Sequence, residues 1–227
     1  MVQNILFDLD ETLLDFKRSE SRALSNMLKY IGVDPTEKVI SRYSEINKSR
    51  WKLLEQGLLT RQQVKESRYE ILFAELGVDY SAAEATAYYE DQLSQKGFMF
   101  PDTIKLLETL HGRYRMYIVS NGGSNVQSGR LADSGIGKYF EDIFISEDAG
   151  AEKPSREFFD YCFGRRPEIE TDETVIIGDS LTSDIQGGIN AGIRTIWFNP
   201  DGQQAVDIHP DYEVKTLMEI PALLEEL

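Results

Sequence analysis

Five short runs of apolar, β-branched or aromatic residues place the strongest constraint on the fold of this chain. None of these runs alternates apolar and polar residues, which is typical of strands that are covered on both faces of a sheet. Stretches of helical periodicity separate the later four runs and predict right-handed crossovers, and therefore a parallel α/β sheet. The predicted strands are Asn4–Leu9, Arg115–Ser120, Asp142–Ile145, Thr174–Gly178 and Arg194–Asn199. The predicted helices between them are Asp102–Leu110, Asn125–Ser134, Ser155–Phe163 and Thr182–Ala191.

The region from residue 17 to residue 97 has a different pattern, with helical periodicity and almost no strand signal. Glycine-containing breaks divide it into several amphipathic segments. We therefore expect an all-helical domain, residues 17–97, inserted into a sheet domain made of residues 1–16 and 98–227. The helices predicted in and next to the insertion are Leu13–Tyr30, Pro35–Gln56, Thr60–Leu76 and Ser81–Gln95.

Charge and composition limit the classes of partner. Lys and Arg number 24 against 39 Asp and Glu, and the resulting net charge of −15 disfavours nucleic acid polymers and anionic membrane surfaces. The first residues lack a basic leader, and Asp8 and Asp10 interrupt their apolar run, so we expect a cytoplasmic protein. Cys162 is the single cysteine, which excludes an intrachain disulfide and predicts a buried packing role.

Polar residues follow the predicted strands, at the edge of a parallel sheet where ligands collect. Taken singly, several of these residues could cap helices or lie in solvent. As a set they converge on one edge and bring together carboxylates, an ammonium group and a glycine-containing turn. The members of the set are Asp8, Asp10 and Thr12 at the end of the first strand, Ser120 and Asn121 at the end of the second, Lys153 after the third, and Asp179 and Asp184 at the end of the fourth and soon after it.

Crowded carboxylates repel one another unless a cation lies between them. A hard divalent ion such as Mg²⁺ prefers oxygen ligands and bridges them to a substrate phosphate. We therefore predict Asp8 and Asp179 as side-chain ligands of Mg²⁺. Asp10 lies two residues beyond Asp8, on the same side of an extended chain, so its backbone carbonyl could join the metal shell.

The motifs occur in an order that resembles the haloacid dehalogenase superfamily of phosphotransferases. Asp-x-Asp-x-Thr comes first, then Ser-Asn-Gly, then Lys-Pro, and then Gly-Asp-Ser-x-x-Ser-Asp. The helical insertion follows the first motif, as does the cap domain of that family. The resemblance implies a Rossmann-like catalytic core of residues 1–16 and 98–227, a helical cap of residues 17–97, and Mg²⁺ as the cofactor.

The resemblance also implies roles for the first motif. Asp8 would attack phosphorus and form an aspartyl-phosphate, which divides one difficult displacement into two easier ones. Asp10 would protonate the leaving oxygen and later deprotonate the attacking water. Thr12 would fix the first loop by local hydrogen bonding.

The later motifs would bind phosphate and metal. Ser120 and Asn121 would hold the phosphoryl oxygens, together with nearby backbone N–H groups, and Lys153 would neutralise charge on the nucleophile and the phosphate. Asp184 matches the second acidic position of the last motif, where the residue binds metal directly or through water, or orients Lys153.

Two segments are similar to bacterial house-cleaning pyrimidine 5'-nucleotidases: DLDETLLDF near the start of the chain and GDSLTSDIQGGINAGI near its end. This similarity predicts hydrolysis of nucleoside 5'-monophosphates, with pyrimidines preferred. The alternatives are a phosphatase of sugar phosphates or other small metabolites, a phosphoglucomutase-type transferase, and a non-catalytic phosphate-binding protein. The dehalogenase subgroup lacks the second aspartate, so Asp10 favours phosphoryl transfer. The oligomeric state cannot be read from these features.

Overall fold

The computed structural model describes all residues, Met1–Leu227, which form two compact units. The sheet unit comprises Met1–Phe16 and Gly97–Leu227, and the helical unit comprises Lys17–Lys96. Gly97, which the sequence assigned to the insertion, lies in the sheet unit because its α-carbon packs against the carbonyl of Arg130, where a Cβ would overlap.

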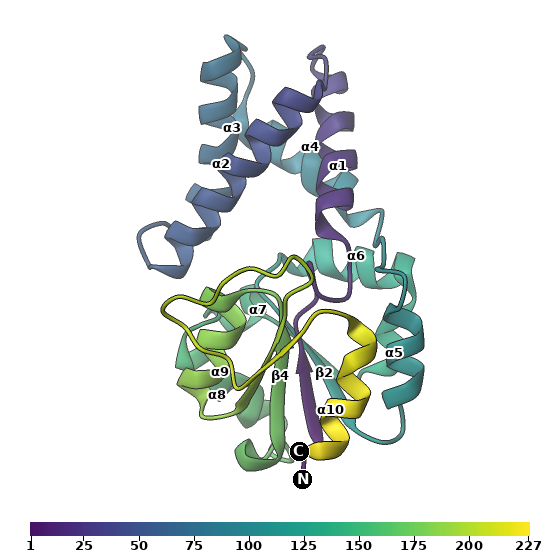
Figure 1. Cartoon of the computed structure of the whole chain (residues 1–227). Coiled ribbons are helices and arrows are strands. Elements are labelled where there is room, and N and C mark those ends of the chain that lie inside the picture. The colour runs from purple at the N-terminus through teal and green to yellow at the C-terminus, as the bar shows by residue number, and fades with distance from the viewer. The chain divides into compact units, whose positions relative to one another are not determined.

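The sheet unit contains six parallel strands in the order β3-β2-β1-β4-β5-β6 (Figure 1). The parallel α/β sheet predicted from the sequence is thus confirmed. The sixth strand was not predicted, because it has three residues and two of them are exposed. The strands are β1 Asn4–Phe7, β2 Arg115–Ser120, β3 Asp142–Ile145, β4 Thr174–Gly178, β5 Arg194–Phe198 and β6 Tyr212–Val214.

Helices cover both faces of the sheet (Figure 1). They give the unit two separate apolar layers. The helices of the sheet unit are α5 Thr103–Leu110, α6 Ser124–Ser134, α7 Ser146–Ala149, α8 Arg156–Arg165, α9 Gln186–Ala191 and α10 Ile220–Glu226.

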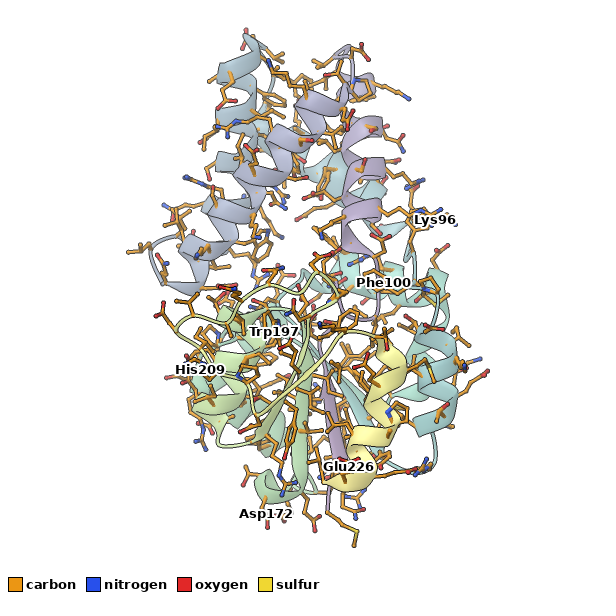
Figure 2. All side chains as sticks on the ribbon, viewed as in Figure 1. Lys96, Phe100, Asp172, Trp197, His209 and Glu226 are labelled. Carbon is orange, nitrogen blue, oxygen red and sulfur yellow. The ribbon has the colours of Figure 1, made fainter.

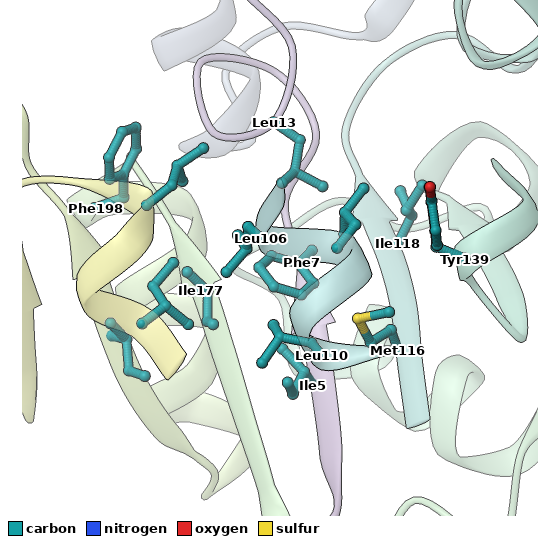
Figure 3. Packing of buried hydrophobic residues seen from close by; sticks show 14 of the residues in the cluster. Ile5, Phe7, Leu13, Leu106, Leu110, Met116, Ile118, Tyr139, Ile177 and Phe198 are labelled. Carbon is teal, nitrogen blue, oxygen red and sulfur yellow. The ribbon is translucent and has the colours of Figure 1, made fainter. Parts of the chain in front are cut away.

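Successive residues of β1 point to opposite layers, as the pleat of a strand requires. Ile5 and Phe7 pack in the layer that contains α5 and α10 (Figure 3). Leu6 packs in the layer that contains α8, and all four residues of β1 are buried. Burial on both sides explains why the strand reads as a continuous apolar run rather than as an alternating one.

The helical unit is built from four helices with well-defined ends. Thr60 begins α3 with a capping box that it shares with Gln63, and Gly77 ends this helix in the left-handed conformation at φ 66°. The first helix begins at Phe16 rather than at the predicted Leu13, because Leu14 forms isolated β-bridges with Asp10 and Met99 and the N–H of Asp15 donates to the carbonyl of Phe98 instead of continuing a helix. The helices are α1 Phe16–Tyr30, α2 Glu37–Glu55, α3 Arg61–Leu76 and α4 Ala82–Ser94. No helix in the chain combines the length and apolar character that crossing a bilayer requires.

The single cysteine provides a test of packing on the α8 face. Cys162 is fully buried, and burial raises the pKa of its thiol to about 12. At pH 8 only about one thiol in 10⁴ would then be the reactive thiolate. We expect no alkylation by iodoacetamide within an hour in the folded protein and complete alkylation in denaturant, measured by intact mass. Rapid labelling of the folded protein would contradict this packing.

Candidate active site

Three carboxylates meet at the carboxyl ends of the strands. Ligand oxygens of Asp8, Asp179 and Asp184 all lie within 4.8 Å of one another. The strand register explains their proximity, because Phe7 of β1 pairs with Ile177 of β4, so Asp8 lies one residue and Asp179 two residues beyond this pair. Asp8 and Asp184 are buried, and Asp179 is partly exposed. The structure therefore brings together the carboxylates that the sequence predicted as metal ligands.

A buried ammonium group lies among these carboxylates. Lys153 Nζ donates to Asp8 Oδ1 at 2.7 Å, to Asp184 Oδ1 at 2.6 Å and to the carbonyl of Val119 at 2.7 Å. These three bonds use all the donors of the ammonium group. The position of Lys153 is thus fixed by the predicted nucleophile, by a second acid and by the end of β2.

The main chain of Lys153 is held as firmly as its side chain. Asn121 donates from Nδ2 to the Lys153 carbonyl and accepts from the Lys153 N–H at its Oδ1, both at 2.9 Å. Helix α7 lies between β3 and Lys153, so this lysine does not follow the strand directly as the sequence had indicated. The side chain of Asn121 therefore holds the main chain of Lys153 in place. Phosphate binding by Asn121 stays a prediction.

The segment after β4 positions the other two acids. Trp197 Nε1 donates to the carbonyl of Asp179 at 2.8 Å, and Trp197 is labelled in Figure 2. A π-helical turn, Leu181–Ile185, precedes α9 in place of the predicted continuous helix and turns Asp184 back toward the strand end. There Asp184 Oδ2 accepts from the N–H of Ser180 at 3.0 Å.

Burial and mutual repulsion set the protonation of the site. Burial, together with the charge of Asp184, raises the pKa of Asp8 to about 7 despite the nearby Lys153. Burial and the charge of Asp8 also raise the pKa of Asp179 well above its usual range. Burial acts to lower the pKa of Lys153, but the charges of Asp184 and Asp8 outweigh it and raise that pKa. The lysine therefore stays charged, while the acids compete for protons.

The first loop turns sharply after Asp8. Glu11 adopts a left-handed conformation at φ 62°, which is uncommon for a residue with a side chain and is found at functional loops. The following residue, Thr12, is fully buried and donates from Oγ1 to Asp8 Oδ2 at 3.2 Å. Both carboxylate oxygens of Asp8 thus accept hydrogen bonds, one from Lys153 and one from Thr12.

Asp10 contacts two side chains that sequence reasoning did not select. Its Oδ1 is paired with Nη1 of Arg130, and its Oδ2 accepts from Nε2 of Gln127 at 2.7 Å. Gln127 also donates to Ser120 Oγ at 2.9 Å. Gln127 and Arg130 lie three positions apart and therefore on one face of the predicted helix Asn125–Ser134, but this spacing does not show which residues that face meets. The backbone carbonyl of Asp10 as a metal ligand stays a prediction.

The charge balance of this arrangement favours a divalent cation. Three carboxylates and one ammonium group leave two negative charges in a largely buried space, and such a set binds a hard cation through oxygen. The residues present therefore fit Mg²⁺. A nucleophilic carboxylate beside a fixed ammonium group is also suited to attack on an anionic phosphoryl group.

The close packing of Asp184 on β4 gives a prediction. A Cβ on Gly178 would overlap the carboxyl group of Asp184, so Gly178→Ala must displace this acid from Lys153. We expect the free energy of unfolding to fall by about 1–3 kcal/mol, measured by urea denaturation. Gly164→Ala in α8, where a Cβ has open space, is the matched control and should be neutral or slightly stabilising. Equal stability of the two variants would contradict the role of Gly178.

Comparison with known proteins agrees with this geometry. The family model of haloacid dehalogenase-like hydrolases matches residues 5–198. YfnB of Bacillus subtilis, whose name places it among the HAD hydrolases, is 38% identical, and the match covers 98% of this chain and 95% of that protein. The pyrimidine 5'-nucleotidases PynA of Streptococcus pneumoniae and YjjG of Escherichia coli are 37% and 31% identical over 98% and 97% of this chain and 94% and 96% of their own. A crystal structure of YfnB bound to magnesium has a TM-score of 0.94 and covers 98% of each chain. The chain therefore belongs to the family of haloacid dehalogenase-like hydrolases.

Proposed function

We propose that this protein is a Mg²⁺-dependent phosphatase that hydrolyses nucleoside 5'-monophosphates through an aspartyl-phosphate on Asp8. The observation that carries the proposal is the buried contact of Asp8 with Lys153, beside Asp179 and Asp184. A site that only bound phosphate would not need a carboxylate at its centre, because that charge repels the ligand. A carboxylate in this position is useful as a nucleophile.

The reaction follows from the side chains present. An Asp8 oxygen forms a bond to phosphorus while the ester bond breaks, and the departing oxygen takes a proton from Asp10. Water then attacks phosphorus, gives a proton to Asp10 and frees Asp8 with release of inorganic phosphate. Proton transfer by a positioned carboxyl group contributes about 10²- to 10⁴-fold to such a step.

Mg²⁺ fits the three acids and would neutralise charge as the phosphoryl group moves. Asp8, Asp179 and Asp184 are the residues that would hold it, with the Asp10 carbonyl as a further oxygen. The structure of YfnB was determined with magnesium bound, which supports this assignment. Lys153, whose three N–H donors bond to Asp8, Asp184 and Val119, would neutralise negative charge on Asp8 and the phosphoryl group, and the O–H of Ser120 would donate to the phosphoryl oxygens.

Nucleoside monophosphates are the substrates we favour, with pyrimidines preferred. Support comes from PynA and YjjG, both named pyrimidine 5'-nucleotidases and similar to this chain over nearly its full length. We also propose that the helical unit serves as the cap of the catalytic core. The structure of YfnB is described as revealing interdomain movement, and a moving cap would shield the aspartyl-phosphate from stray nucleophiles. The predicted cytoplasmic location is part of this proposal.

The nucleophile assignment can be tested directly. Wild-type protein with Mg²⁺ should release phosphate from UMP and CMP, and chelation should stop the reaction. Asp8→Asn should lower kcat on the order of 10³-fold or more, as loss of a covalent nucleophile does in other enzymes. Asp172→Asn, at an exposed position marked in Figure 2, should leave turnover unchanged. Undiminished phosphate release by Asp8→Asn would exclude the mechanism.

The same assay distinguishes the candidate substrates. Turnover of purine nucleotides, hexose 6-phosphates and hexose 1-phosphates should have a lower kcat/KM than turnover of UMP and CMP. Conversion of a hexose 1-phosphate to its 6-phosphate without net phosphate release would instead indicate a mutase.

Proton competition at Asp8 predicts how metal affinity depends on pH. Because the pKa of Asp8 is about 7, the site holds a proton below this pH, and Mg²⁺ must displace it. Above pH 7 the carboxylate is free. We expect the Kd for Mg²⁺, measured by calorimetry, to rise by about tenfold or more for each pH unit below 7, because Asp179, whose pKa is also raised, competes for protons as Asp8 does. The dependence should flatten in Asp8→Asn. A constant Kd between pH 5.5 and 8 would contradict this arrangement.

A further inference from the structure

Helix α6 presents two buried polar side chains, Gln127 and Arg130, to the residues proposed to act on the substrate. We call this pair the α6 clamp. Gln127 donates to Asp10 and to Ser120, and Arg130 is paired with the other oxygen of Asp10. No family motif in the sequence analysis includes either residue of the clamp.

We propose that the α6 clamp positions Asp10 for proton transfer and holds Ser120 ready to donate to the phosphoryl group. The inference rests on the proposed function, because it assigns roles relative to that reaction. Gln127 and Arg130 act through Asp10 and Ser120, so they are positioning residues rather than catalytic ones.

The hydrogen bonds leave Gln127 one orientation of its amide. Its Oε1 accepts from Arg130 Nη1 at 2.9 Å, and its Nε2 donates to Asp10 at 2.7 Å and to Ser120 at 2.9 Å. A flipped amide would place its oxygen against the Asp10 carboxylate and its NH₂ against the guanidinium group. Arg130 thus orients Gln127, and Gln127 orients both residues of the site.

Ser120 is prepared as a donor by the same bonds. Its Oγ accepts from Gln127 Nε2 and also from the N–H of Gly122 at 3.1 Å. These two donors occupy the lone pairs of the hydroxyl, so its hydrogen remains available for a phosphoryl oxygen. The clamp therefore determines the direction in which Ser120 donates.

Asp10 is held but not enclosed. Its side chain is 26% exposed, whereas Arg130 is fully buried beneath it. Each carboxylate oxygen of Asp10 accepts one hydrogen bond from the clamp and keeps a second lone pair. The exposed side of the carboxylate is therefore accessible to a leaving group or to water. The clamp thus fixes the direction of the carboxylate without blocking it.

The energetics of Arg130 favour a functional role. Its Nε and Nη2 are buried without a hydrogen-bond partner, and its guanidinium group lies over the ring of Phe16 at 5.5 Å. Buried cations with unsatisfied donors destabilise a fold, and apolar residues commonly replace buried ion pairs without loss of stability. A clamp on Asp10 gives a reason for this cation that stability does not.

The loop after β2 is shaped to fit the clamp. A Cβ on Gly122 would overlap the side-chain amide of Gln127. Glycine at this position therefore allows Gln127 to reach Asp10. Gly122→Ala would disturb the clamp while keeping both of its side chains.

The kinetic test compares two leaving groups. The 5'-alkoxide of UMP needs a proton to depart, whereas p-nitrophenolate leaves without one. For a reaction through a covalent intermediate, kcat/KM reports the steps up to departure of the leaving group. We expect Arg130→Met to lower kcat/KM for UMP by about 10- to 100-fold, as a misplaced catalytic group does, and to change kcat/KM for p-nitrophenyl phosphate far less. Arg130→Lys keeps a charged donor near Nη1 and should recover part of the loss.

Gln127→Leu should act differently, because it releases Ser120 as well as Asp10. We expect it to raise KM for both substrates in addition to lowering kcat/KM for UMP. Ser128→Ala, at an exposed position of the same helix, is the matched control and should match wild type. Equal losses on the two substrates in Arg130→Met would overturn the assignment to Asp10.

Two further measurements separate positioning from a structural effect. If Arg130 acts through Asp10, adding Arg130→Met to Asp10→Asn should cost little more than Asp10→Asn alone. Fully additive losses would overturn the proposal. The side-chain NH₂ of Gln127, assigned in NMR spectra by its absence in Gln127→Leu, should shift in both Asp10→Asn and Arg130→Met.

The NMR measurement requires no turnover, so it remains decisive if the wild-type protein releases no phosphate from any ester. In that case the proposed function fails on its own, and an unchanged Gln127 signal in Asp10→Asn would overturn the clamp separately.

Discussion

The contact of Lys153 with Asp8 and Asp184 is the interaction on which the rest of the site depends. Its ammonium group is almost completely buried, and both acids lie within 2.7 Å of it. Removing these charges from water has a large cost, and their mutual attraction offsets it only when every donor is satisfied. Here the carbonyl of Val119 satisfies the third donor. Asp179 adds a third carboxylate, so the single charge of Lys153 does not balance the acids. A bound divalent cation would supply the missing positive charge.

The scaffold around this contact limits the movement of each charged group. The side-chain amide of Asn121 bonds to both the N–H and the carbonyl of Lys153. It thereby joins the loop that follows β2 to the segment that contains Lys153. Ser180 N–H holds Asp184, and Trp197 holds the carbonyl of Asp179. Because these supports come from rigid strand ends, the acids cannot move apart to relieve their repulsion. Preorganisation of this kind keeps the electrostatic environment ready before a substrate arrives.

The sequence predicted the parts of the structure whose signals are local. Strands buried on both faces read as continuous apolar runs, and the polar residues after them mark the site edge, so the acids and Lys153 could be located by reasoning from topology. Strand β6 was missed because Tyr212 and Glu213 are exposed and the strand has only three residues. The π-helical turn at Leu181–Ile185 was missed because helical periodicity does not distinguish a widened turn from a regular one.

The contacts of the α6 clamp are not predictable from the sequence for a different reason. They depend on which strand end the helix faces in the folded chain. Gln127 and Arg130 were part of a predicted helix, but periodicity gives only the face of a helix and not the residue that this face meets. Asp10 lies 117 residues before Gln127 and 120 before Arg130, so only the folded chain reveals the pairing. Long-range polar contacts of this kind have no local sequence signature.

The two buried arginines of the chain show how context separates a structural cation from a functional one. Arg68, in the helical unit, bonds to Asn47 at 3.0 Å and to the carbonyl of Lys65 at 3.1 Å, and three tyrosine rings surround it at 4.9–5.8 Å. Aromatic faces and neutral acceptors stabilise this cation in place, which suits a role in the core of a small helix bundle. Arg130 has one aromatic contact, two nitrogens without partners, and its single charge partner is the partly exposed Asp10. A cation that the fold satisfies so poorly, beside a carboxylate that must exchange protons, is better explained by the chemistry of that carboxylate than by packing.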